Sequence, residues 1–311
     1  MLGESNELNV VTGAFGYTGK YIAQNLLSMQ KRVKTLTRRP LSDNPFGNSI
    51  SIAPLNFRDP NELVKSLCGA TTLYNTYWIR FPYGKATFEE AITNTKTLIT
   101  AAQEAGIQRI VHISVTNAST ASPLPYFRAK GMVEEAIISS RISYAIIRPT
   151  VIFGTEDILI NNIAWFLRRF PIFVVSGSGN YNLQPIYVED VANAAITASY
   201  QSENIIWDVC GPETYTFNAL VGLIAEKIGG KAKVIHLQPR LSLLFAKLLG
   251  YLLRDVVLTR DEMNGLMSDM LVSNNYRVGQ TRFVEWLEAN ANIIGIKYES
   301  ELKRHYPKGL R

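Results

Sequence analysis

Cysteine and histidine are scarce in this chain. Among 311 residues there are two cysteines and three histidines, well separated along the sequence. Two distant cysteines without a CxxC spacing give no disulfide framework, which indicates a reducing compartment. The histidines lie in unrelated contexts, so the sequence gives no reason to expect a metal site.

Long apolar runs and clustered charges are also lacking. No stretch reaches the roughly 18 apolar residues that a membrane-spanning helix requires, and the chain starts without an apolar signal core. The net charge of +6 is spread along the sequence. It suits a phosphate-bearing ligand or an anionic membrane surface, and it gives no ground for nucleic-acid binding. We therefore expect a soluble, cytoplasmic protein.

Strand-like and helix-like segments alternate through the first half. Strand patterns occur at 8–12, 33–37, 50–55, 71–76, 109–114 and 143–148, and helix patterns at 18–30, 60–68, 86–105 and 126–140. This succession predicts an α/β fold, a doubly wound parallel sheet with helices on both faces. The rhythm then changes to longer helices and loops. We expect a dinucleotide-binding domain at 1–153 and 185–210, and a smaller, mostly helical substrate-binding region at 154–184 and 211–311.

A glycine-rich loop follows the first strand. Gly13, Gly16 and Gly19 are spaced G-x-x-G-x-x-G and lead directly into an amphipathic helix pattern. Glycine permits a tight turn, a close approach of the backbone to a pyrophosphate, and close packing of helix on strand. The free N–H groups at the start of the helix attract the phosphates. The loop therefore predicts a dinucleotide site, the alternative being a tight turn without a ligand.

The second strand ends in arginine rather than in an acidic residue. An acidic side chain at this place would select NAD through the ribose 2′-hydroxyl. Arg38 and Arg39 stand there instead, and guanidinium groups suit the 2′-phosphate of NADP. We therefore favour NADP over NAD, with a solvated basic loop as the alternative.

Tyr126 precedes Lys130 by four residues, just inside a predicted helix that Pro125 opens. Residues at this spacing project from the same helical face. A phenol has a pKa near 10, and a neighbouring ammonium and a helix N-terminus both lower it. We therefore expect Tyr126 to act as an acid or base with Lys130 as its electrostatic helper.

A hydroxyl that orients a carbonyl is expected at the end of the fifth strand, because the carboxyl ends of parallel strands line the ligand crevice. Ser114 and Thr116 both lie there. Side chains alternate along a strand, so the sequence leaves open which of the two hydroxyls points inward.

The chain resembles the extended and atypical short-chain dehydrogenase/reductases. The matching segments are "TGAFGYTG" (12–19), "YFRAK" (126–130), "IIRPTVIFG" (146–154), "PIYVEDVANAA" (185–195) and "DVCGPETYTFNAL" (208–220). They occur in the family's order and leave the last sixty or so residues least diagnostic. In its arginine after the second strand, the chain resembles the atypical branch of this family, which includes relatives of the nitrogen-metabolite-repression regulator and of the complex I accessory subunit.

This resemblance implies roles for particular residues. Tyr126 would exchange the proton, Lys130 would bind the nicotinamide ribose, and Ser114 or Thr116 would complete the catalytic site. The cofactor site would comprise Gly13, Ala14, Phe15, Gly16, Tyr17, Thr18, Gly19, Arg38, Arg39, Asn56, Phe57, Thr76, Tyr77, Lys130, Pro149 and Val151. Asn56 departs from the family's aspartate, and Val115 separates the two candidate hydroxyls.

Two further segments have alternative interpretations. The aromatic residues of "TYWIRFPYG" (76–84) form either an apolar wall for a substrate or ordinary core. The apolar segment 241–254 packs as a cap on the substrate pocket, forms a homodimer contact, or lies on a membrane surface.

Together these observations predict an NADP-dependent dehydrogenase/reductase, or an epimerase-like enzyme, that acts on a small hydrophobic molecule. The alternative is a cofactor-binding regulatory or accessory protein without turnover.

Overall fold

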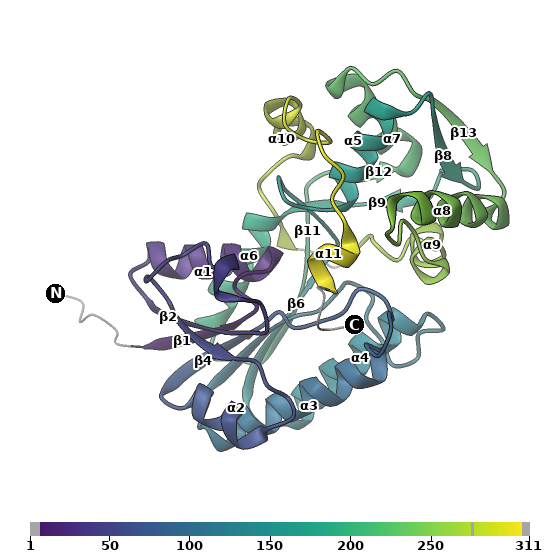
Figure 1. Cartoon of the computed structure of the whole chain (residues 1–311). Coiled ribbons are helices and arrows are strands. Elements are labelled where there is room, and N and C mark those ends of the chain that lie inside the picture. Colours follow the sequence, from purple (N-terminus) through teal and green to yellow (C-terminus); the bar gives the residue numbers. More distant parts are fainter. Residues whose placement is uncertain (1–6, 275–276, 307–311) are drawn as a thin grey trace.

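A parallel sheet runs through the centre of the computed structural model, which describes residues 7–274 and 277–306 (Figure 1). Its strands are β1 (Leu8–Thr12), β2 (Arg32–Thr37), β3 (Ser51–Pro54), β4 (Ala70–Asn75), β5 (Arg109–Ile113), β6 (Ser143–Pro149), β11 (Ile205–Cys210) and β14 (Arg277–Val278). They are ordered β14-β11-β6-β5-β4-β1-β2-β3. The order reverses between β1 and β4, which is where ligands bind in open α/β sheets.

Helices cover both faces of this sheet. They are α1 (Tyr17–Ser28), α2 (Pro60–Leu67), α3 (Phe88–Glu104), α4 (Pro125–Ser139) and α6 (Val188–Ser199). Successive side chains of a strand point to opposite faces, so Val10 packs in the core under α2, α3 and α4. Val11 packs in the opposite core with α1 and α6. The doubly wound α/β fold expected from the sequence is thereby confirmed.

The rest of the chain forms smaller sheets and helices above the carboxyl end of the central sheet (Figure 1). The strands are β7 (Val151–Phe153) with β10 (Pro185–Tyr187), β8 (Ile172–Ser176) with β13 (Lys233–Leu237), and β9 (Asn182–Leu183) with β12 (Tyr215–Thr216). The helices are α5 (Leu159–Arg169), α7 (Phe217–Ile228), α8 (Pro239–Leu253), α9 (Arg260–Met267), α10 (Phe283–Asn290) and α11 (Glu301–His305). The short helix η1 (Leu41–Asp43) is not part of this group, because it connects β2 to β3. The small strands and helices α5, α7, α9 and α10 share a separate apolar core that includes Phe153, Phe283 and Trp286. Helix α11 instead places Leu302 in a small cluster with Phe81 and Tyr306.

The chain returns to the central sheet twice after residue 184. β11 pairs with β6, and β14 then pairs with β11 at the edge of the sheet, although β14 lies in the part that we assigned to the substrate-binding region. The boundaries between the dinucleotide-binding domain and the substrate-binding region therefore stay a prediction. Among the described residues, no helix combines the length and the apolar character that crossing a bilayer requires.

Candidate functional site

The glycine loop between β1 and α1 has the backbone geometry of a phosphate-binding turn. Gly13 has a φ of +68°, and its carbonyl oxygen accepts a hydrogen bond from Gly16 N at 2.7 Å. A Cβ atom on Gly19 would lie 2.5 Å from the Gly13 carbonyl oxygen, so only glycine fits at that position. Helix α1 has no acidic residue in its first turn and no side-chain cap, which leaves its positive end open to an anion.

A cleft of roughly 430 Å³ extends from this loop across the ends of β2, β4 and β5 to the start of α4. Twelve of the residues expected at the site line it: Gly13, Gly16, Tyr17, Thr18, Gly19, Arg38, Arg39, Thr76, Tyr77, Ser114, Tyr126 and Lys130. The structure therefore brings the glycine loop, the arginine pair and the tyrosine–lysine pair to one cavity.

Lys130 is buried beside the end of β5. Its Nζ donates a hydrogen bond to the carbonyl oxygen of Ile113 at 2.9 Å and lies 4.6 Å from the ring centroid of Trp78. Burial lowers the pKa of Lys130 to about 7, and the nearby Glu134 carboxylate opposes that shift. The Lys130 ammonium therefore gives up its proton far more readily than that of an exposed lysine.

Tyr126 lies in an aromatic enclosure formed by Trp78, Phe88 and Phe127. Burial raises the pKa of Tyr126 to about 12, and the cation that lowers it is Arg80 rather than Lys130. This direction differs from the lowered value that the spacing to Lys130 suggests. The physical reason is that the loss of hydration of a buried phenolate outweighs the attraction of the nearby cation.

The two candidate hydroxyls point to different partners. Ser114 lines the cleft, but its Oγ donates to Glu134 Oε1, and Arg148 holds that carboxylate in place. Thr116 is buried away from the cleft, where its Oγ1 donates to Asp208 Oδ2 at 3.0 Å. The alternation that the sequence left open therefore places Ser114 on the cleft side.

Several residues expected at the cofactor do not line the cleft. Ala14 and Phe15 belong to the loop itself, and both are buried in the core with α1 and α6. Phe57 packs on Tyr77 with 4.7 Å between ring centroids. The Nδ2 of Asn56 donates a hydrogen bond to Glu62. The carbonyl oxygen of Pro149 accepts a hydrogen bond from Thr116 N. Val151 packs in the core shared by α5 and α7.

The two arginines after β2 have different environments. The guanidinium of Arg38 is exposed, lines the cleft and lies 5.6 Å from the ring centroid of Tyr77. Arg39 donates from Nη1 to the Phe15 carbonyl oxygen at 2.9 Å and from Nη2 to the Arg304 carbonyl oxygen at 2.8 Å. Arg38 is therefore the cation of this pair that is available to a ligand.

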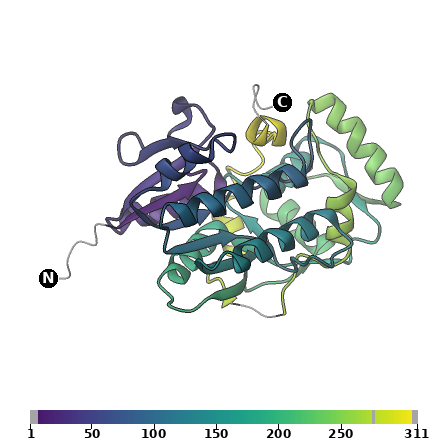
Figure 2. The same cartoon turned by 90° about the horizontal axis from the view of Figure 1, so that it is seen from below.

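Part of the cleft comes from the end of the chain, where no sequence motif indicated a site. Helix α11 lies beside the carboxyl edge of the sheet (Figures 1 and 2), and Glu301, Arg304 and His305 line the cleft with Asp157 and Arg80. Arg80 pairs with Glu301. A local pattern could not reveal these contacts, because their partners are far apart in sequence. Trp78, named as either wall or core, lines the cleft.

The cleft has features that fit a nicotinamide dinucleotide. Besides the loop that only glycine can form, Trp78 Nε1 and Tyr17 Oη are buried without a hydrogen-bond partner among the described residues. Both side chains line the cleft. Buried polar atoms of this kind are costly unless a ligand or water completes them, so the residues present fit the expected cofactor.

Comparisons with known proteins agree with this geometry. Residues 13–160 match the family described as NAD(P)H-binding. The chain is 27% identical over 286 residues to subunit 9 of the NADH dehydrogenase [ubiquinone] 1 alpha subcomplex, a mitochondrial protein of Arabidopsis thaliana, covering 85% of this chain and 71% of the relative. It is 28% identical to the Mus musculus protein, covering 71% of this chain. Because it spans only 61% of that mouse protein's length, the activity and partners of the whole relatives do not transfer directly.

Solved structures show the same fold. Triphenylmethane reductase of Citrobacter sp., complexed with NADP(H), superposes with a TM-score of 0.67 at 18% identity, covering 91% of this chain and 99% of that one. The UDP-N-acetylglucosamine 4-epimerase of Bacillus cereus has a TM-score of 0.68 at 15% identity, covering 95% and 99%. The expected resemblance is thereby confirmed: the chain has an NAD(P)-binding domain of the Rossmann type and is similar to subunits of the mitochondrial NADH dehydrogenase.

Proposed function

We propose that the protein is an NADP(H)-dependent oxidoreductase that reduces a carbonyl compound. The observation that carries this proposal is the position of Tyr126 and Lys130 in the same cleft as the glycine loop. A dinucleotide held by its pyrophosphate at α1 would extend toward these two side chains. The bound cofactor would supply the hydride, and the protein supplies the proton and the positioning.

Tyr126 is suited to give a proton rather than to take one. Its pKa of about 12 keeps the phenol protonated at neutral pH, which supports reduction of a carbonyl over oxidation of an alcohol. The Tyr126 phenol would give its proton to the carbonyl oxygen of the substrate, and solvent would restore that proton afterwards. Lys130 and Trp78 line the same cleft as Tyr126 and limit where a substrate can lie.

Arg38 supports the preference for NADP. It is the exposed cation at the end of β2, and Arg39 next to it is occupied by two backbone carbonyls. A guanidinium at this place binds a 2′-phosphate through charge-assisted hydrogen bonds. The absence of an acidic residue at the same strand end removes the usual ligand of the NAD ribose.

A second candidate is a cofactor-binding accessory protein without turnover. Ser114, the hydroxyl on the cleft side, donates to Glu134 and is thereby withheld from a substrate. Relatives described as NADH dehydrogenase subunits support the same alternative.

Nucleotide identification and a tyrosine variant test the proposal. Mass spectrometry of the purified protein should find NADP(H), and NADPH oxidation should be measured against a panel of carbonyl compounds. Tyr126→Phe should retain NADPH binding and lose at least a hundredfold in turnover, whereas Tyr144→Phe on β6 should leave both unchanged. Equal turnover in wild type and Tyr126→Phe would remove Tyr126 from the mechanism, and NADPH binding without any oxidation would favour the accessory protein.

A further inference from the structure

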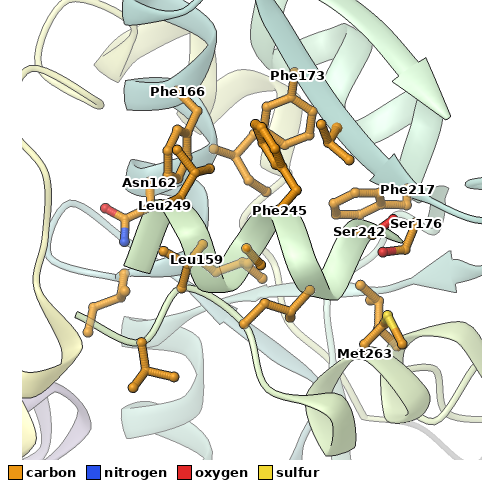
Figure 3. Close-up of a pocket in the computed structure, with 18 of the residues that line it drawn as sticks. Leu159, Asn162, Phe166, Phe173, Ser176, Phe217, Ser242, Phe245, Leu249 and Met263 are labelled. Atoms are coloured by element: carbon orange, nitrogen blue, oxygen red, sulfur yellow. The ribbon is translucent and has the colours of Figure 1, made fainter. Parts of the chain in front are cut away.

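A second pocket, with a volume of about 160 Å³, lies between α5, β8, α8 and α9 (Figure 3). Its wall is formed largely by apolar side chains, among them Leu159, Phe166, Phe173, Phe217, Phe245 and Leu249. An apolar cavity of this size accepts an apolar group about as large as a benzene ring. The chemistry of the wall therefore selects a hydrocarbon group.

This apolar pocket adjoins the dinucleotide cleft. Arg80, Ile158, Leu159 and Glu301 line both cavities. Arg80 is also the cation that lowers the pKa of Tyr126, so the junction lies beside the proposed proton donor. A molecule with an apolar tail in the pocket would present its polar end to Arg80 and to the dinucleotide cleft.

Helix α8 forms one wall of the pocket and is apolar on its outer face as well. Ser242, Phe245, Ala246 and Leu249 face the cavity. The outward side chains are Leu241, Leu244, Leu248, Tyr251 and Leu252, which are 51%, 55%, 59%, 85% and 74% exposed. Figure 2 shows α8 as the light green helix at the edge of the molecule.

Three exposed basic residues, Arg240, Lys247 and Arg254, accompany these leucines on or next to α8. An apolar helix face flanked by Lys and Arg is the arrangement that lies in an anionic lipid interface. The net charge of +6 acts in the same direction. The charge and the continuity of α8 with the apolar pocket identify a lipid surface as the occupant of this face.

We propose that the apolar pocket binds the hydrocarbon tail of an amphiphilic carbonyl compound, which enters from an anionic lipid surface against the outer face of α8. The polar head then lies at Arg80, next to Tyr126. Conversion of the head rests on the proposed function; binding of the tail does not require it.

Binding of a probe tests the pocket directly. Methyl hexyl ketone would be titrated by calorimetry into wild type and into Ala246→Phe, which fills the cavity from α8. Ala246→Phe should weaken binding at least tenfold, and Leu248→Ser on the opposite face of α8 should leave it unchanged. If Ala246→Phe does not fold, Phe245→Ala provides the test, because a larger pocket should shift preference to longer tails. Equal binding by wild type and the folded pocket variants would show that the hydrocarbon tail does not bind in this pocket.

Vesicle co-sedimentation tests the outer face. Wild type and Ala246→Phe should sediment with phosphatidylcholine vesicles that contain phosphatidylserine, and the double variant Leu244→Ser/Leu248→Ser should not. If wild type does not sediment, or if it forms a dimer in solution that the double variant dissociates, the outer face of α8 does not bind a lipid surface. NADPH binding is measured in parallel for each variant. Ketone binding without NADPH oxidation in wild type would leave the pocket standing and remove the proposed function.

Discussion

Arg39 connects the glycine loop to the last helix of the described chain. Its Nη2 donates to the carbonyl oxygen of Arg304 at 2.8 Å, and its Nη1 donates to that of Phe15 at 2.9 Å. Helix α11 is also held by the Arg80–Glu301 ion pair and by a hydrogen bond from Tyr306 Oη to the Phe81 carbonyl oxygen. One wall of the cofactor cleft therefore depends on a guanidinium from the loop that follows β2.

Replacing Arg39 by alanine should disturb the cleft as a whole. The change removes two hydrogen bonds from a charged donor, and we expect a loss of about 1–3 kcal/mol in the free energy of unfolding. NADPH and NADH affinity should fall together, because the loop and α11 serve both nucleotides. Urea unfolding and fluorescence titration with each nucleotide measure these effects. A loss confined to NADPH would show that Arg39 binds the 2′-phosphate itself.

Replacing Arg38 by alanine should discriminate between the two nucleotides. Loss of a charge-assisted hydrogen bond costs about 1.5–3 kcal/mol, so NADPH affinity should fall by about 10- to 100-fold while NADH affinity changes little. Arg169→Ala removes an equal charge from the end of α5, outside the cleft, and is the matched control. Equal losses for both nucleotides would remove the argument for NADP.

Gly19 should be intolerant of a methyl group. A Cβ atom there would lie 2.5 Å from the carbonyl oxygen of Gly13 and 3.2 Å from that of Thr12, so Gly19→Ala must displace the loop. We expect at least tenfold weaker binding of both nucleotides and a loss of about 1–3 kcal/mol in stability. Gly222→Ala in α7 meets no atom within 4 Å and should gain about 0.5–1 kcal/mol. Unchanged nucleotide binding by Gly19→Ala would place the pyrophosphate elsewhere.

Lys130 should make stability depend on pH in the alkaline range. Burial lowers its pKa from 10.5 to about 7, so its contribution is fully present above pH 10.5 and is lost as the pH falls toward 7. Lys130→Met abolishes this titration. The free energy of unfolding of the variant, relative to wild type, should therefore be higher at pH 7 than at pH 10, by at most about 4 kcal/mol. Thermal melts across this range measure the difference. The exposed Lys247→Met should show no such trend, and a constant difference for Lys130→Met would contradict the burial of the charge.

The sequence predicts the features that depend on local pattern. The alternation of Val10 and Val11 between two cores follows from strand periodicity, and the glycine spacing predicts the turn before α1. Contacts between distant segments leave no such signal, and so the pairing of Arg39 with Arg304 and of Arg80 with Glu301 was not foreseen. The pKa of Tyr126 was expected in the wrong direction, because the spacing to Lys130 says nothing about the burial imposed by Trp78 and its neighbours.

Asp157 should make stability depend on pH in the acidic range. Its carboxyl lines the cleft, and burial raises its pKa from 3.8 to about 7 despite a 2.6 Å hydrogen bond from Ile160 N. A raised value in the folded state means that stability is greatest below pH 3.8 and is lost as the pH rises through 7. Asp157→Asn retains an acceptor for Ile160 and does not titrate. Wild type should therefore lose up to about 4 kcal/mol relative to this variant between pH 4 and pH 8, which urea unfolding at several pH values measures. Asp43→Asn at an exposed carboxyl is the control, and parallel pH profiles of wild type and Asp157→Asn would show that the carboxyl titrates normally.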